Sequence, residues 1–134
     1  MFVSDTKLRV LYAHTDKMGV VYYGNYYEFF EAGRNDMLRI LGMPYTEIES
    51  LGYIIPVLKS HCEYFTPAKY DQLINIRCYL KEMPAARMRI DYEITFEGEK
   101  IATGYTEHCF ANMHTFKPSR PPEKFTELLK KYYK

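Results

Sequence analysis

Residues 25–41 carry the pattern of one long amphipathic helix, which is the only long helix that the sequence predicts. Apolar or small residues recur there at helical spacing, at Tyr26, Phe29, Phe30, Gly33, Met37, Leu38 and Leu41. Such a wide apolar stripe predicts a helix that is largely buried. Gly33 on this stripe predicts a close approach to another backbone segment. Asn25 and Glu28 form an N-x-x-E start that resembles a capping box.

Most of the remaining sequence predicts β-strands. Residues 87–97 alternate between apolar and polar side chains, which indicates a strand with one buried and one exposed face, and a hairpin turn follows at 97–99. The other predicted strands cover residues 4–11, 53–65 (with an edge position or a bulge at Pro56), 72–82 and 100–113, and shorter helices are predicted over 45–51 and 123–132. We expect the strands after the long helix to lie side by side in chain order. One helix covering one antiparallel sheet defines a two-layer α+β domain.

Length, charge and cysteine content limit the function classes. With 134 residues the chain has room for a single domain, residues 1–134. Its 18 basic and 17 acidic side chains nearly cancel, which argues against nucleic-acid binding. No apolar run reaches the ~18 residues of a membrane span, and no Walker or G-x-G-x-x-G loop supports ATP or NAD binding. Three widely spaced cysteines and a start without a signal-peptide pattern predict a cytoplasmic protein with reduced thiols.

The segment between the first strand and the long helix suggests chemistry. Asp16 lies in this predicted loop, and four tyrosines fall within residues 22–27. The free N–H groups of a helix start can bind an anion or a polarised carbonyl oxygen, and an aromatic lining excludes water. This arrangement suits acid–base or nucleophilic chemistry at a carbonyl group. From the residues alone, however, Asp16 is equally well explained as a turn residue.

The run Y-x-x-T-D-x-x-G-V-V-Y-x-x-N-Y-x-x-F-F-E-x-x-R over residues 12–34 resembles the N-terminal signature of the hotdog-fold acyl-CoA thioesterases. The resemblance is closest to the 4-hydroxybenzoyl-CoA thioesterase and YbgC-type branch, and residues 64–71 (YFTPAKYD) resemble a further stretch of the same family. It implies a hotdog fold, in which a five-stranded antiparallel sheet wraps around one long central helix. With the helix predicted over 123–132, this gives an α+β domain with a short C-terminal helix. The family pattern also implies a homodimer joined edge to edge, which assembles further into a homotetramer.

The resemblance implies roles for the residues at the loop and the helix start. Asp16 matches the family's catalytic carboxylate, which acts as a general base or as the nucleophile. Tyr12 matches a tyrosine of the YbgC-type branch. Tyr23 stands where that branch has a histidine, and because its reference pKa near ~10 makes it a poor base, we expect it to donate a hydrogen bond or to wall the acyl pocket. The backbone N–H groups of Tyr23 and Gly24 would form the oxyanion site.

The implied substrate is an acyl-CoA thioester, with no cofactor apart from the CoA of the substrate and no metal. The residues expected to line the acyl group surround the helix start, namely Tyr22, Asn25, Tyr26 and Phe30. The phosphates of CoA need Arg or Lys side chains. The candidates for these contacts are Lys59, Arg87, Arg89 and Arg120.

Three alternatives stay open. The substrate can be an acyl carrier protein, because residues 117–134 carry a local excess of positive charge that suits an acidic partner. The chain can also be a hotdog protein that binds acyl-CoA, or serves as an interaction subunit, without hydrolysis. Glu31 on the predicted helix is a second candidate carboxylate, although an ion pair with Arg34 or a contact with a partner chain is the preferred explanation for it.

Overall fold

A computed structural model describes residues 1–133 of the chain. Its long strands are β1 (Phe2–Arg9), β3 (Val57–Tyr64), β4 (Leu73–Leu80), β5 (Arg87–Phe96) and β6 (Glu99–Asn112). The helices are α1 (Asn25–Leu41), α2 (Tyr45–Ser50) and α3 (Glu123–Leu129), with 3-10 turns at Tyr12–His14 and Lys130–Tyr132. Two short strands, β2 (Tyr53–Ile54) and β7 (Pro118–Ser119), pair with the end of β6. None of the helices in residues 1–133 is long and apolar enough to span a membrane.

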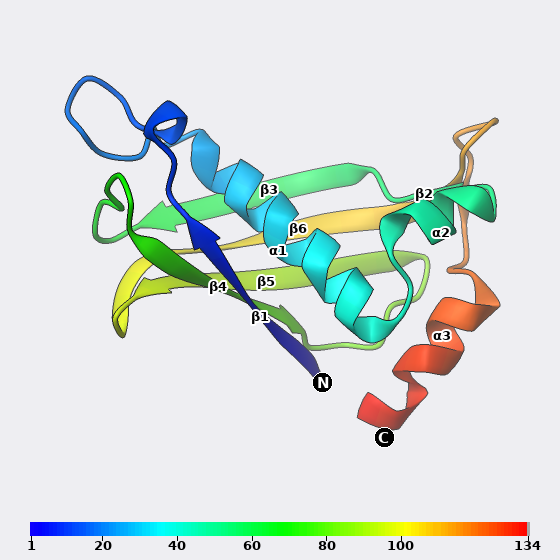
Figure 1. Cartoon of the computed structure of the whole chain (residues 1–134). Coiled ribbons are helices and arrows are strands. Elements are labelled where there is room, and N and C mark those ends of the chain that lie inside the picture. The colour runs from blue at the N-terminus through cyan, green and yellow to red at the C-terminus, as the bar shows by residue number, and fades with distance from the viewer. Residues whose placement is uncertain (134) are drawn as a thin grey trace.

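The sheet curves around α1, and the helix lies across its concave face (Figure 1). The long strands follow the order β1–β4–β5–β6–β3, and each neighbouring pair is antiparallel. This is the hotdog arrangement that the sequence predicted, with one long central helix and a short C-terminal helix. The hairpin between β5 and β6 also forms as predicted, with Glu97 and Gly98 at positive φ.

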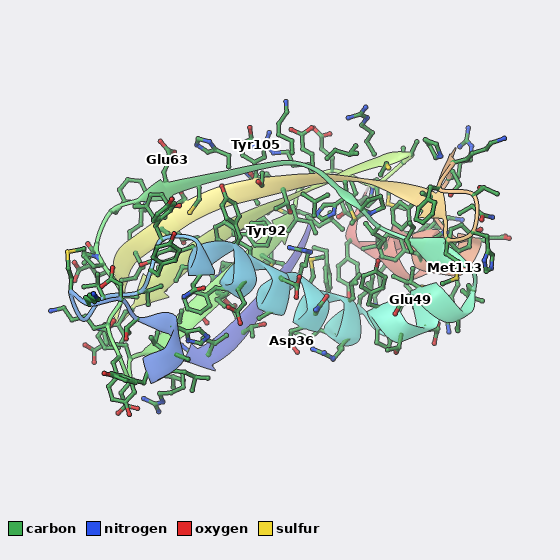
Figure 2. The ribbon with its side chains drawn as sticks, turned by 90° about the horizontal axis from the view of Figure 1, so that it is seen from above. Asp36, Glu49, Glu63, Tyr92, Tyr105 and Met113 are labelled. Atoms are coloured by element: carbon green, nitrogen blue, oxygen red, sulfur yellow. The ribbon has the colours of Figure 1, made fainter. Side chains whose placement is uncertain are left out.

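Aromatic packing fixes α1 on the sheet. The ring of Phe30 stacks on that of Tyr92 in β5, with the centroids 4.3 Å apart and the planes at 11°. Figure 2 shows Tyr92 on the helix side of the sheet and Tyr105 on the opposite side. Gly104 of β6 makes room for this stack, because a Cβ atom at that position would lie 2.7 Å from a carbon of the Phe30 ring. The helix can therefore approach β6 closely only where the strand has no side chain.

The predicted order of the strands is wrong. β3 does not pair with β4 but with the free edge of β6, and its register runs from Val57 opposite His108 to Tyr64 opposite Ala102. The other edge of β6 is already occupied by β5 through the hairpin, so β3 takes the remaining edge. The predicted strand over 53–65 is divided at Pro56 into β2 and β3, and the register shifts after Val57, as the proline predicted.

Two predictions about α1 are also corrected. No side chain caps the helix, whose N-cap is Gly24, so the capping box is wrong. Asn25 is instead the first helical residue, and its side-chain amide donates a hydrogen bond to the His14 carbonyl at 2.8 Å. The close approach at Gly33 is to side chains of β4 rather than to backbone, since a Cβ atom there would lie 2.7 Å from Ile76 Cγ2 and 3.0 Å from Cys78 Sγ.

β3 forms an exposed edge of the sheet. Its residues are exposed or half-buried on both faces, and the apolar side chains of Val57 and Leu58 are 47% and 48% exposed. An exposed edge strand presents unpaired backbone N–H and C=O groups that another strand can bind. This edge is therefore the part of the sheet best suited to contact a second chain.

A chain of buried polar groups lies on the concave face of the sheet. The hydroxyl groups of Tyr92 and Thr106 are 2.5 Å apart, and His108 Nε2 lies 2.8 Å from Thr106 Oγ1. His108 Nδ1 faces the Ile55 carbonyl at 3.4 Å, and because a carbonyl can only accept, Nδ1 carries the proton. Nε2 then accepts from Thr106, which in turn accepts from Tyr92. Burial, together with the positive charge of Arg34, lowers the pKa of His108 to about 4.

Replacing His108 with glutamine should flatten the acid dependence of folding stability. As the pH falls from 6.5 to about 4, this histidine becomes protonated in the unfolded chain but stays neutral in the folded one. The wild type therefore loses up to about 3 kcal/mol over this window on account of His108, and His108→Gln should lack that loss. Urea unfolding at several pH values measures it, and parallel stability curves for the two proteins would contradict the assignment.

Candidate active site

Asp16 lies in a tight loop held by backbone hydrogen bonds. Thr15 and Val21 form a bridge, Asp16 N–H donates to the Val20 carbonyl at 2.9 Å, and Gly19 N–H donates to the Asp16 carbonyl at 3.0 Å. Gly19 takes a φ of 79°, which favours glycine. The Asp16 carboxylate accepts a hydrogen bond from Met18 N–H at 2.8 Å and is half-buried. The turn role that the residues suggested is thus real, and it also holds the carboxylate in a fixed position.

The loop is tied to the start of α1 and to the connection before β4. The His14 carbonyl accepts hydrogen bonds from Tyr22 N–H at 2.9 Å and from the Asn25 side chain at 2.8 Å. Val21 N–H donates to the Ala68 carbonyl at 2.8 Å. The two segments that carry the family resemblance, 12–34 and 64–71, therefore meet in space at this point.

Two backbone N–H groups just before α1 find no acceptor in the part of the chain that the structure describes. Asn25 N–H donates to the Tyr22 carbonyl. Tyr26 N–H and Tyr27 N–H donate to the carbonyls of Tyr23 and Gly24. Across residues 1–133, by contrast, neither Tyr23 N–H nor Gly24 N–H finds a hydrogen-bond partner. Free donors at a helix start, where the helix dipole is positive, suit a developing negative charge on oxygen.

The predicted tyrosines fall into an exposed group and a buried group. Tyr12, Tyr22 and Tyr23 are 78%, 49% and 63% exposed. The rings of Tyr22 and Tyr23 lie 4.8 Å apart, and Tyr64 of β3 packs edge-on against Tyr23 at 6.3 Å. These rings form an accessible aromatic surface beside the helix start.

Tyr26 and Phe30 are core residues rather than lining residues of an open pocket. They are 3% and 0% exposed within the single chain. The Tyr26 hydroxyl accepts a hydrogen bond from Ala68 N–H at 3.2 Å, and burial raises the pKa of Tyr26. The single chain therefore leaves neither side chain a free surface for an acyl group.

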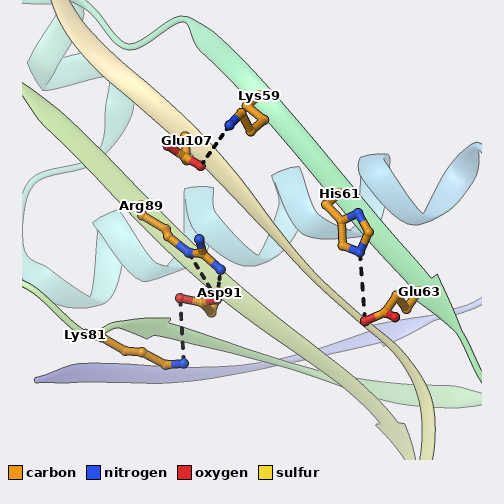
Figure 3. A network of polar contacts seen from close by, with 7 residues as sticks. All are labelled: Lys59, His61, Glu63, Lys81, Arg89, Asp91 and Glu107. Carbon is orange, nitrogen blue, oxygen red and sulfur yellow. Dashed lines mark hydrogen bonds and ion pairs between the residues drawn. The ribbon is translucent and has the colours of Figure 1, made fainter.

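The predicted phosphate ligands lie on the convex face of the sheet or near its end. Figure 3 shows Lys59 paired with Glu107 at 3.9 Å and Arg89 paired with Asp91 at 3.1 Å on one face. The Arg89 guanidinium also covers the Tyr105 ring at 3.9 Å. Arg87 is exposed at the start of β5, whereas Arg120 is exposed after β7. Arg87 and Arg89 line one hollow, whereas Lys59 and Arg120 are not part of its lining.

Two other carboxylates, Glu31 and Glu63, lie in ion pairs, and for Glu31 this is the explanation that the sequence favoured. Glu31 lies 3.8 Å from Arg34 across one turn of α1. Glu63 lies 3.8 Å from His61 on the same face of β3, while Cys62 alternates to the other face. Within residues 1–133, no group of three His, Cys, Asp or Glu side chains is arranged to hold a metal ion.

The sequence patterns did not predict the buried hydrogen-bonded group of Tyr92, Thr106 and His108. A signal was available, because Thr106 and His108 occupy inward-facing positions of β6, where the alternation calls for apolar side chains. Tyr92 brings a hydroxyl group into a stripe that otherwise consists of apolar side chains. Only the pairing of β5 with β6 shows that the three side chains meet.

A sheet wrapped around one helix, with a carboxylate and free N–H groups at the helix start, places this chain among hotdog proteins built to act on a carbonyl group. Residues 10–129 match the family model of the thioesterase-like superfamily. The chain belongs to this superfamily, and the enzyme is a thioester hydrolase.

Individual relatives cover three quarters of the chain or more. An acyl-CoA thioesterase named YbgC from Helicobacter pylori is 29% identical over 132 residues, covering 92% of this chain and 97% of its own. A putative esterase from Aquifex aeolicus is 32% identical over 101 residues, which is 75% of this chain and 79% of that protein. The crystal structure of a DHNA-CoA thioesterase from Staphylococcus aureus superimposes with a TM-score of 0.93 at 34% identity, covering 98% and 91% of the two chains.

Replacing Tyr26 with phenylalanine should lower stability and spare activity. Ala68 is fully buried, so its N–H group would lose its acceptor, which costs about 1–3 kcal/mol. Tyr70→Phe is the matched control at a residue that is 57% exposed, and we expect it to change stability by less than ~0.5 kcal/mol. Chemical unfolding and thiol release measure the two effects. A loss of activity at unchanged stability would show that Tyr26 contacts the substrate.

Proposed function

We propose that this thioesterase hydrolyses acyl-CoA thioesters, with Asp16 as the carboxylate that activates water and the N–H groups of Tyr23 and Gly24 as the oxyanion site. The observation that carries the proposal is the pair of free N–H donors at the start of α1. They directly follow the loop that holds Asp16. The name of the acyl-CoA thioesterase from Helicobacter pylori supports CoA as the thiol part of the substrate.

The reaction divides into addition and elimination. Asp16 takes a proton from water as the water oxygen bonds to the thioester carbon, and the carbonyl oxygen becomes an oxyanion between the two N–H donors. The carbon–sulfur bond then breaks, the electron pair leaves with the CoA sulfur, and the proton returns to the sulfur. The products are a carboxylic acid and free CoA. In a covalent variant of this proposal, the Asp16 carboxylate attacks the carbon itself, and the carbon–sulfur bond breaks with its electron pair leaving on the CoA sulfur. Water then hydrolyses the resulting anhydride, which restores the Asp16 carboxylate, releases the carboxylic acid and supplies the proton that the sulfur takes.

Replacing Asp16 with asparagine should lower kcat by about 10²–10⁴-fold. Asparagine keeps an oxygen that can accept from Met18 N–H, so the loop geometry should survive while the base is lost. Release of free thiol from a panel of short, long and aromatic acyl-CoAs measures the effect, and the melting temperature checks the fold. An unchanged kcat would remove Asp16 from the mechanism.

We propose further that the working unit is a homodimer joined through β3. The exposed edge of β3 supports this arrangement, as does the exposure of the aromatic surface beside it, including Tyr64 at 48%. Pairing two copies of β3 would satisfy the edge and would cover the aromatic rings near Asp16, which a water-excluding site needs.

Replacing Leu58 with glutamate should therefore shift the protein toward monomer and lower its activity, because the two-fold symmetry of a dimer brings two such charges to one interface. Leu51→Glu is the matched control, since Leu51 is similarly exposed at 51% but lies after α2. Light scattering gives the mass of each variant and thiol release gives its activity. A dimer of unchanged stability with glutamate at position 58 would contradict the β3 interface.

The remaining expectations are predictions of the same proposal. They are a homotetramer of two such dimers, a cytoplasmic location, phosphate contacts by Lys59, Arg87, Arg89 or Arg120, and turnover without a cofactor. Comparing kcat/KM for an acyl-CoA and the matching acyl carrier protein decides between those two substrates.

A further inference from the structure

A cavity lies between α1 and the concave face of the sheet, beyond the helix start. It has a volume of about 200 Å³, and its polar lining comes from Glu31, Arg34, Asn35 and His108. The rest of its lining is mostly apolar, at Leu38, Ile55, Met88 and Ile90 among others. An apolar cavity of ~150 Å³ holds a benzene molecule, so this one has room for a ring or a short aliphatic segment with one polar substituent.

Arg34 supplies most of the hydrogen-bond donors in this cavity that lack a partner. Its side chain is only 18% exposed, and its ion pair with Glu31 is 3.8 Å long, beyond hydrogen-bond distance. Glu31 is 61% exposed, so solvent screens the pair and the carboxylate is free to turn away. A guanidinium group has five N–H donors. Most of them therefore remain available to an oxygen atom in the cavity.

The buried polar side chains of the sheet, Tyr92, Thr106 and His108, bring no negative charge to neutralise Arg34. His108 is neutral, and its Nε2 and Nδ1 atoms are engaged with Thr106 and Ile55. Tyr92 donates its proton toward Thr106, so its oxygen is free to accept from Arg34. The sheet thus offers the guanidinium a neutral hydrogen-bond acceptor and no carboxylate.

A second hollow lies next to this cavity, because Glu31 and Arg34 line both of them. Its volume is about 280 Å³, and its lining also includes Tyr27 and Glu28, which lie nearer the start of α1. Glu28 lies 3.8 Å from His14, whose carbonyl anchors the Asp16 loop. Ten residues separate Gly24 from Arg34, a rise of about 15 Å along the helix, and helical side chains lean toward the N-terminus. An acyl group of moderate length can span this path.

From these contacts we infer that Arg34 recognises a hydrogen-bond-accepting oxygen at the far end of the acyl group, so that the enzyme prefers acyl chains ending in a hydroxyl or a carboxylate over plain alkyl chains. This inference rests on the proposed hydrolysis of acyl-CoA. The thioester lies at the helix start, the acyl chain follows the hollow beside Tyr27 and Glu28, and its terminal oxygen meets the guanidinium inside the cavity.

Three CoA esters with the same number of carbons test the inference: octanoyl-CoA, ω-hydroxyoctanoyl-CoA and suberoyl-CoA. The wild type should show a higher kcat/KM for the two oxygen-terminated esters. Arg34→Met should lower kcat/KM for those two by about 10–100-fold, because a hydrogen bond to a charged group is lost, while octanoyl-CoA changes little. Arg34→Lys should recover part of the preference for suberoyl-CoA, since the charge returns without the fork.

The control is Arg39→Met on the same helix, where the arginine is 63% exposed and pairs with Asp36. It should leave the order of the three substrates unchanged. The inference is overturned if the wild type does not discriminate among the three esters, or if Arg34→Met lowers kcat/KM for all of them equally, which would mark a purely structural role.

Equilibrium binding of the three esters to the Asp16→Asn variant separates this inference from the proposed function. One outcome is that the wild type releases no thiol, while suberoyl-CoA binds more tightly than octanoyl-CoA and this preference is lost with Arg34→Met. That outcome would refute the hydrolysis but uphold the recognition. Thiol release without any dependence on the chain terminus would uphold the hydrolysis and refute the recognition.

Discussion

The structure depends on how closely α1 approaches the sheet. Phe30 lies flat on Tyr92, Gly104 leaves the space that its ring needs, and Gly33 lets the helix rest on Ile76 and Cys78. Burial of this face contributes most of the favourable energy that one helix can provide to one sheet. It also sets the position of the N-terminal end and of the middle of α1. The N-terminal end presents its free N–H groups beside the Asp16 loop, and the middle of the helix forms the roof of the cavity.

β6 organises the rest of the molecule. It pairs with β5 along one edge and with β3 along the other, and its C-terminal end also pairs with β2 and β7. Its inward-facing side chains are unusual, since Thr106 and His108 bring polar groups into the core and Gly104 brings no side chain at all. Such a strand would be weak alone. Its long pairing with two neighbours and the completed hydrogen bonds of its polar groups compensate for this.

The two candidate sites of the protein differ in physical character. The helix start offers backbone donors, and the neighbouring loop holds a carboxylate through several hydrogen bonds of its own backbone. The cavity offers the Arg34 guanidinium, which has a long ion pair with the exposed Glu31, among mostly apolar side chains. The first arrangement suits a reaction in which charge develops on one oxygen, whereas the second suits recognition of an oxygen that is present throughout.

The sequence by itself determined the elements and the position of the chemistry. Helical spacing located α1, alternation located β5, a hairpin turn joined it to β6, and the pattern around Asp16 indicated the loop and the helix start. These signals are local, because each depends on residues within a few positions of one another. Only the tertiary structure decided the rest. The place of β3 follows from which edge of β6 stays free, Asn25 anchors the loop rather than capping the helix, and Tyr26 and Phe30 are core residues. Arg34, Tyr92, Thr106 and His108 meet only because strands distant in sequence pair beneath one helix, and no local pattern specifies that pairing.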